Sequence, residues 1–295
     1  MLTSMTAKNA LIQPDRGQKA TAIHLMTKSG LADFAKGLSP AQRAALAAQK
    51  FEGSAFEQAV LPDGDEWLVA AGVADTEKLS SWCLAKLAET LPAGSYRLAT
   101  GEVSPNGLDR ALIGWASGQY RFDRYRSEPK EEGARVLLTG QAKSIDPALA
   151  EAEALALVRD LVNTPAEDMG PAELEEAAEA IAKAHKADFR VTQGDTLERE
   201  FPMVHMVGRA AAREKAPRMI ELEWGNAKHP RLALVGKGKP AGNRRVISRR
   251  AGIGLAGHAD AEGQRRAAVL RHLRQQFGIV GGVGQDGDEI VVLGR

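Results

Sequence analysis

The stretch LVRDLVNTPAEDMGPAELEEAA, residues 157–178, holds the end of one expected helix and the start of another. Pro165 disfavours helical geometry in the residue before it, so a helix over residues 147–162 ends at Asn163-Thr164. A second helix begins at Gly170-Pro171, because proline suits the first helical turn and the glutamates that follow suit the positive end of a helix. The runs DFRVTQ, RMIELEWG and RLALVGKG then read as strands. Strand–helix–strand alternation predicts an α/β fold with a largely parallel sheet.

The chain ahead of this stretch also alternates between the two kinds of element. Apolar spacing and residue propensities predict helices over residues 31–38, 41–50, 76–91 and 108–120. Short apolar runs predict strands over residues 66–73, 91–99 and 134–140. In the helix over 76–91, one face is expected to carry Leu79, Trp82, Leu87 and Leu91.

Composition and charge narrow the class of protein. No apolar run approaches the length of a bilayer span, so we expect no membrane partner. A single cysteine, Cys83, excludes an intrachain disulfide and fits a reducing cytoplasm, where it is expected to be a small core residue. The formal net charge of +1 suggests no bulk attraction to nucleic acid, although residues 231–276 hold eleven Lys/Arg against two Asp/Glu, a local balance of +9. The charge balance of the chain therefore changes near residue 240.

The glycine-rich motifs near this change do not form phosphate sites. Gly236-Lys237-Gly238 lacks the upstream glycine and the following Ser/Thr of a P-loop. GIGLAG at 252–257 fits G-x-G-x-x-G, but no clean apolar strand precedes it and no acidic residue follows about twenty residues later. We interpret it as a flexible loop.

Two further features after residue 240 leave alternatives open. In an extended segment Asp260 and Glu262 would project to one side and could hold a divalent metal, or they belong to a polar turn before a helix. The Arg-rich stretch 244–274 is consistent with anion or nucleic-acid binding, with a solvated face, or with a gene read out of frame.

Residues 155–242 resemble the leucyl (cytosol) aminopeptidase family, which are bimetallic hexameric exopeptidases. The stretch over residues 157–178 resembles the Asn-Thr-Pro segment that precedes the catalytic domain of that family. The stretches FPMVHMVGRAA, APRMIELEWG and HPRLALVGKG follow in the order of the family. Upstream, LPAGSYRLA and GWASGQYRFDRY resemble the amino-terminal domain of bacterial members.

The resemblance implies a role for each candidate site residue. Family members read G-K-G, a short segment containing F-D-T-G-G, then K-P. By this match Lys237 is a neutral metal ligand and Lys239 polarises the scissile carbonyl, while Asp260 and Glu262 match the later N-T-D-A-E-G-R motif, with Gln264 in place of its arginine. The segment with the aspartate that bridges both metals is missing between Lys237 and Lys239. The resemblance thus implies two divalent ions, Mn or Zn, in a site whose ligand set is incomplete here.

Four segments follow from these observations. We predict a mobile extension over 1–20, a small N-terminal α/β domain over 21–140, the start of an incomplete α/β/α catalytic domain over 141–243, and a divergent Arg-rich tail over 244–295. Two explanations of the tail stay open: an internal deletion that joins the lysines to a genuine Asp260–Gly263 motif, or a frame change after Asn243.

The expected function is that of a metallo-aminopeptidase of this family, defective in this chain. It would act in the cytoplasm on short peptides and assemble as a homo-oligomer, a hexamer in the family. The alternatives are a non-catalytic remnant or interaction protein of the same family and, as a weaker option, anion or nucleic-acid binding by the basic tail.

Overall fold

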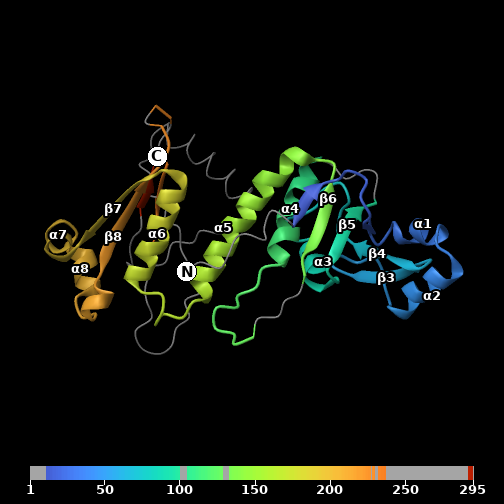
Figure 1. The fold of residues 1–295 in the computed structure, drawn as a ribbon, viewed down its shortest axis with the longest axis horizontal. Coiled ribbons are helices and arrows are strands. Elements are labelled where there is room, and N and C mark those ends of the chain that lie inside the picture. The colour runs from blue at the N-terminus through green and yellow to red at the C-terminus, as the bar shows by residue number, and fades with distance from the viewer. Residues whose placement is uncertain are drawn as a thin grey trace. The chain divides into compact units, whose positions relative to one another are not determined.

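The computed structural model describes residues 11–99, 105–128, 133–226, 228–229, 232–236 and 292–294. The chain divides into two units, Met1–Asn163 and Thr164–Arg295. Helices and strands alternate in both (Figure 1), which confirms the predicted α/β fold class. Within the described residues, no helix combines the length and the apolar character that a bilayer span requires.

The first unit is built on a six-stranded sheet. Its strands run in the order β1 (Ile12–Pro14), β6 (Arg135–Thr139), β5 (Gly94–Leu98), β2 (Thr21–Met26), β4 (Glu66–Gly72) and β3 (Gln58–Asp63). Every neighbouring pair is parallel except β3 and β4, which form an antiparallel pair at one edge. The sheet of the first unit is therefore largely parallel, although the sequence predicted such a sheet from the strands of the second unit.

Helices cover both faces of this sheet. Because side chains alternate along a strand, Leu68 and Ala70 of β4 point to one face, and Val69 and Ala71 point to the other. The first pair belongs to an apolar cluster with α1 (Leu31–Lys36) and the loops around α2 (Pro40–Ala48). The second pair belongs to a larger cluster with α3 (Ala85–Thr90), α4 (Pro105–Gly118) and α5 (Ile145–Asn163). Strands buried on both faces read as continuous apolar runs, as β4 does.

The second unit carries a four-stranded sheet in the order β7, β8, β10, β9. The bounds of its elements are α6 Pro171–His185, β7 Asp188–Gln193, α7 Gly194–Glu200, α8 Pro202–Gly208, β8 Arg218–Glu223, β9 Ala233–Val235 and β10 Val292–Gly294. Short 3-10 turns cover Ala142–Ser144 and Arg213–Lys215, in the first and second unit respectively. The predicted start of α6 at Gly170-Pro171 is confirmed, and the backbone N–H of Gly170 donates to Glu173 Oε2 at 2.8 Å.

Strand direction in the second unit differs from the expectation for this region. β7 and β8 pair antiparallel, as do β10 and β9, and only β8 and β10 are parallel. Because β7 and β8 are antiparallel, β8 begins at the end of the sheet where β7 stops. Two short helices and a 3-10 turn connect these two strand ends. Alternation of elements in the sequence does not fix that direction.

Part of the predicted mobile extension is ordered. Ile12–Pro14 form β1, which pairs parallel with β6, and Ile12 is buried in the larger apolar cluster. Arg97 on β5 fixes the next residue, because its Nη2 donates to Asp15 Oδ1 at 2.9 Å. A strand of three residues is too short to stand out in a sequence of ordinary composition.

The helix predicted over 76–91 is shorter than expected. Only Ala85–Thr90 are helical, and the segment before them forms turns. Leu79, Leu87 and Leu91 are buried as predicted, whereas Trp82 is 52% exposed. The reason lies in α4, where a Cβ on Gly114 would lie 2.1 Å from the carbonyl oxygen of Ser81. This backbone contact holds residues 79–84 as a turn against α4.

The predicted domain bounds remain predictions. Helix α5 falls in the range 141–243, for which we predict the start of the catalytic domain, yet it packs on α4 and contributes Ile145, Ala148, Leu149 and Ala152 to the core of the first unit. The division into compact units therefore lies at Asn163, at the end of that helix.

Candidate functional site

The strand that leads to the lysine pair is β9. It ends at Val235, and Gly236 is the last described residue before Lys237. Lys237, Lys239, Asp260 and Glu262 all lie outside the described residues. The same holds for GIGLAG at 252–257 and for the basic stretch 244–274. The proximity of the four candidate site residues therefore stays a prediction.

The described surroundings of β9 are open. Its partner is β10, with Leu234 opposite Leu293 and Val235 opposite Val292. Leu234 and Val235 are partly exposed, and Leu232 just before the strand is exposed. A strand in the centre of an α/β sheet is buried on both faces. In the described part of the second unit, β9 is thus more exposed than a central strand of such a sheet.

Several acidic side chains in the described part of this unit have structural partners. Arg218 pairs with Glu175, and Arg190 Nε lies 2.8 Å from Glu221 Oε2. Glu173 caps α6. No group of three or more His, Cys, Asp or Glu side chains within the described ranges could hold a metal ion.

Asn163, in the Asn-Thr-Pro segment, also has a structural role. Its Nδ2 donates to the Tyr120 hydroxyl at 3.3 Å, and that hydroxyl donates to Asp160 Oδ1 at 2.7 Å. The Arg159 guanidinium lies over the Tyr120 ring, 5.3 Å from its centre. Burial, together with the bond to Asp160, raises the pKa of Tyr120 to about 12. These contacts hold the end of α5 against the segment after α4.

Cys83 has the structural role predicted for it. It is buried in the larger apolar cluster, and its Sγ donates to the carbonyl oxygen of Ser80 at 3.1 Å. Burial raises the pKa of the thiol to about 11, so little reactive thiolate forms near neutral pH.

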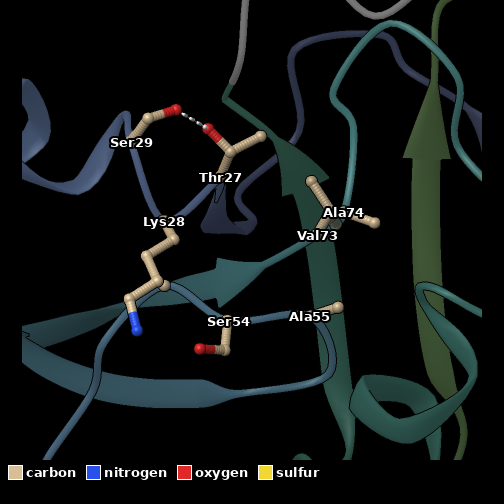
Figure 2. A pocket seen from close by; sticks show the side chains of 8 residues that line it. Thr27, Lys28, Ser29, Ser54, Ala55, Val73 and Ala74 are labelled. Atoms are coloured by element: carbon tan, nitrogen blue, oxygen red, sulfur yellow. Dashed lines mark hydrogen bonds between the residues drawn. The ribbon is translucent and has the colours of Figure 1, made fainter.

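A hollow that was not predicted from the sequence lies in the first unit. Figure 2 shows it beyond the ends of β2 and β4, where Thr27, Lys28, Ser29, Ser54, Ala55, Val73 and Ala74 line it together with Gly53. The hollow has a volume of about 560 Å³ and is open to solvent. The available signal was Thr27–Gly30, a polar turn directly after the apolar run TAIHLM. Because the sequence analysis does not predict this run as a strand, it does not predict a site in the turn that follows.

Comparison with known protein families covers most of the described chain. The N-terminal domain of M17 aminopeptidases matches residues 21–139, and the catalytic domain of the cytosol aminopeptidase family matches residues 156–239. The two matches occur in the family order and together span about two-thirds of the chain. The chain belongs to the M17 (cytosol) aminopeptidase family. Lys237 and Lys239 fall within the catalytic-domain match.

Individual relatives agree with this family. The chain is 29% identical to a probable cytosol aminopeptidase of Brucella ovis over 306 residues, covering 90% of this chain and 60% of that protein. It is 34% identical to a probable cytosol aminopeptidase of Wolinella succinogenes over 146 residues, covering 44% of this chain and 30% of that protein.

Solved structures also agree with the M17 fold. The crystal structure of the cytosol aminopeptidase from Coxiella burnetii superposes with a TM-score of 0.64 at 31% identity, covering 74% of this chain and 47% of that one. The bottromycin maturation enzyme BotP, solved in complex with Mn, shares the fold at a TM-score of 0.55 and 24% identity, over 70% of this chain and 45% of that one. The chain therefore spans about half the length of the solved relatives that it matches.

Proposed function

We propose that this chain derives from an M17 metallo-aminopeptidase, which releases N-terminal residues from short peptides by metal-activated water, and that the chain by itself is defective in that reaction. The observation that supports the reaction class is the catalytic-domain match over residues 156–239, which includes both lysines. In the proposed site Lys237 is a metal ligand and Lys239 polarises the scissile carbonyl.

The charges of the proposed ligand set explain the expected defect. Two divalent cations bring four positive charges into a partly dry site, and carboxylates must neutralise most of them. A neutral lysine ligand supplies no negative charge, so Asp260 and Glu262 would supply at most two. The residues present therefore do not fit a pair of tightly bound divalent ions. A site that lacks charged ligands loses metal affinity.

The two comparisons differ on the residues after Lys239. The family match ends at Lys239. The match to the Brucella ovis protein covers 90% of the 295 residues, so it leaves out about 30 and necessarily includes residues 31–265. This longer match extends past Asp260 and Glu262, and an internal deletion that joins them to the lysines is one of the two proposed explanations. The excess of arginine over 244–274 supports the alternative, a change of reading frame.

The hydrolysis of leucine p-nitroanilide by the purified chain, with added Mn²⁺ or Zn²⁺, tests this proposal. The same assay is run on Lys239→Ala and Glu262→Ala, with Lys19→Ala and Glu66→Ala as matched controls. Lys19 and Glu66 form an exposed ion pair in the first unit, so their replacement should change neither folding nor hydrolysis.

Each outcome assigns the chain to one function. Absence of metal-dependent hydrolysis in a folded sample supports the defect and makes the chain a non-catalytic member of its family. Metal-dependent hydrolysis that is lost in Lys239→Ala and Glu262→Ala, but kept in both controls, would show that the site is functional despite the missing aspartate. Hydrolysis that is unchanged in all variants would come from a contaminating peptidase.

Other proposed properties follow from the family and need their own tests. We propose a cytoplasmic protein that forms a homo-oligomer, a hexamer as in the family, which light scattering would measure. Anion or nucleic-acid binding by residues 244–274 is the weaker alternative. It requires binding that falls steeply with salt concentration, since phosphate contacts release counterions.

A further inference from the structure

The open hollow in the first unit lies where the sheet changes its direction of winding. β2 and β4 are neighbouring parallel strands, with Met26 opposite Gly72 at their carboxyl ends. The chain leaves β2 toward α1 and α2 on one face, and it leaves β4 toward α3 on the other face. Adjacent strands whose connections leave to opposite faces create a crevice at their carboxyl ends, which is the usual ligand site of open α/β sheets.

The walls of the hollow are held in place by the protein itself. Gly53 has a left-handed φ of +73°, and a Cβ there would lie 3.2 Å from both Lys28 Cα and the carbonyl oxygen of Thr27. A Cβ on Gly72 would lie 2.0 Å from the carbonyl oxygen of Ser54. Glycine at these two positions lets the loop before β3 approach the ends of β2 and β4 closely.

A carboxylate completes this loop. Glu57 Oε2 accepts hydrogen bonds from the backbone N–H groups of Glu52 at 2.8 Å and Ser54 at 3.1 Å. These bonds hold the pKa of Glu57 below its usual value, so the carboxylate stays ionised. Since Glu57 is engaged by the backbone, the shape of the hollow does not depend on a ligand. A preformed site of this kind loses little free energy to ordering when it binds.

The polar groups that line the hollow are suited to an anion. Thr27, Ser29 and Ser54 supply hydroxyls and Lys28 supplies an ammonium, and the carboxylates of Glu52 and Glu57 lie behind the lining residues. The hydroxyls of Thr27 and Ser29 hydrogen-bond to each other at 2.9 Å on one side of the hollow, and the Lys28 ammonium and the Ser54 hydroxyl lie on the other side (Figure 2). Ala55, Val73 and Ala74 form a small apolar wall beside them.

Lys28 is available to a ligand at little cost. Its Nζ lies 3.0 Å from Glu52 Oε2, which raises the pKa of Lys28, but the two side chains are 69% and 65% exposed. An ion pair exposed to this degree contributes little, so the ammonium can turn to another anion. The hollow, about 560 Å³, has room for more than a bare ion, and because it is open to solvent a ligand there would stay partly exposed.

We propose that this hollow binds a small molecule that carries an oxyanion, either a phosphate or a carboxylate. Lys28, turned from Glu52, and the Ser54 hydroxyl hold the oxyanion, and the organic part lies against Ala55, Val73 and Ala74. Every residue of this site belongs to the first unit, whereas the proposed peptidase lysines belong to the second.

Calorimetric titration of the full chain tests this proposal with three probes: inorganic phosphate, AMP and leucyl-leucine. Lys28→Met removes the ammonium, and Ala74→Phe fills the hollow without a change in charge. Ala74 is exposed, so the larger side chain does not disturb the core. The matched control is Lys36→Met, because Lys36 pairs with Asp33 on α1 in an equally exposed way, outside the hollow.

We expect saturable binding of at least one probe, weakened about tenfold or more by Lys28→Met because a charge-assisted hydrogen bond is lost. Ala74→Phe should weaken it similarly, and Lys36→Met should leave it unchanged. Binding of phosphate and AMP identifies a phosphate ligand, and binding of leucyl-leucine alone identifies a carboxylate. No saturable binding of any probe at millimolar concentration, or binding that survives both Lys28→Met and Ala74→Phe, would overturn the proposal. No readout depends on hydrolysis, so failure here leaves the proposed function untouched.

Discussion

The two units of this chain bury their apolar residues to different degrees. In the first, helices cover both faces of the sheet, and the two apolar clusters fill the space between. In the second, the buried apolar residues among those described are only Ala177, Ala182, Leu197, Met219 and Ile220. Large apolar side chains are exposed in both units, and in the second they are Met203, Met206, Val207, Trp224 and Leu232. Burial of apolar area is the main source of stability, so we expect the first unit to be the more stable one.

This difference also bears on function. The proposed oxyanion site is built from residues of the well-packed unit, and glycine contacts and Glu57 fix its walls. The proposed peptidase residues follow β9, a partly exposed strand in the less packed unit. A catalytic site requires its ligands to be held by packed neighbours. The comparison thus favours a working binding site in the first unit and a weakened one in the second.

Replacement of Trp115 should produce the largest effect. Trp115 is fully buried, and its Nε1 donates to the carbonyl oxygen of Arg135 at 2.9 Å. Trp115→Ala should lower the unfolding free energy of the first unit by about 3–5 kcal/mol, because it leaves a cavity and removes one of the two side-chain hydrogen bonds to that carbonyl, the other coming from Gln119. Trp224→Ala, at an exposed position of the second unit, should change stability by less than about 0.5 kcal/mol.

Hydrogen exchange measured during a urea titration separates these two effects, since peptides from each unit report their own midpoints. Equal losses of unfolding free energy for Trp115→Ala and Trp224→Ala would contradict the expected difference in packing between the two units.

Addition of one methyl group to α4 should have the next largest effect. A Cβ on Gly114 would lie 2.1 Å from the carbonyl oxygen of Ser81, a backbone atom that cannot move aside alone. Gly114→Ala should therefore cost about 1–3 kcal/mol by overpacking. Gly140→Ala is the control, because a Cβ there meets no atom within 4 Å. The same titration measures both variants, and a neutral Gly114→Ala would show that the turn over 79–84 is not held by α4.

The pairing of β1 should make the smallest contribution, and it should depend on pH. Hydrogen bonds from Arg97 and from the backbone of Gly17 lower the pKa of Asp15 from 3.8 to about 2. A carboxylate with a lowered pKa stabilises the folded state above pH 3.8, and this contribution disappears as the pH falls toward 2. Asp15→Asn should therefore reduce stability at neutral pH and converge with the parent chain near pH 2.

Thermal melts of the parent chain and Asp15→Asn between pH 2 and pH 7 measure this convergence. A constant difference across that range would show that the Asp15–Arg97 pair does not carry the effect.

The sequence predicts helices well where a few neighbouring residues fix the helix start. Gly170-Pro171 marks the start of α6, and Ser39 with Gln42 forms a capping box at the start of α2, close to the predicted helix start. Trp82 was misplaced because a contact from Gly114, distant in sequence, turns its segment out of the helix. β1 and β2 were missed because a strand of three residues and a strand of mixed polarity carry weak patterns.

The two candidate sites also differ in whether their residues are adjacent in the sequence. Lys237 and Lys239 were found because a motif of adjacent residues carries the resemblance, and the catalytic-domain match includes both. The hollow beside Lys28 was not found, because Thr27, Ser54 and Val73 come together only through the pairing of β2 with β4. A site assembled by sheet topology leaves no contiguous motif in the sequence.

The measurement that tests the proposed defect most directly is the number of metal ions that the folded chain retains. Purified chain is incubated with Mn²⁺ or Zn²⁺, dialysed and analysed for bound metal, beside Glu262→Ala and the control Glu66→Ala. We expect fewer than two ions per chain and no difference between the two variants, because the proposed ligands supply at most two negative charges. Two retained ions per chain, lost in Glu262→Ala and kept in Glu66→Ala, would contradict the proposed defect and establish a complete metal site.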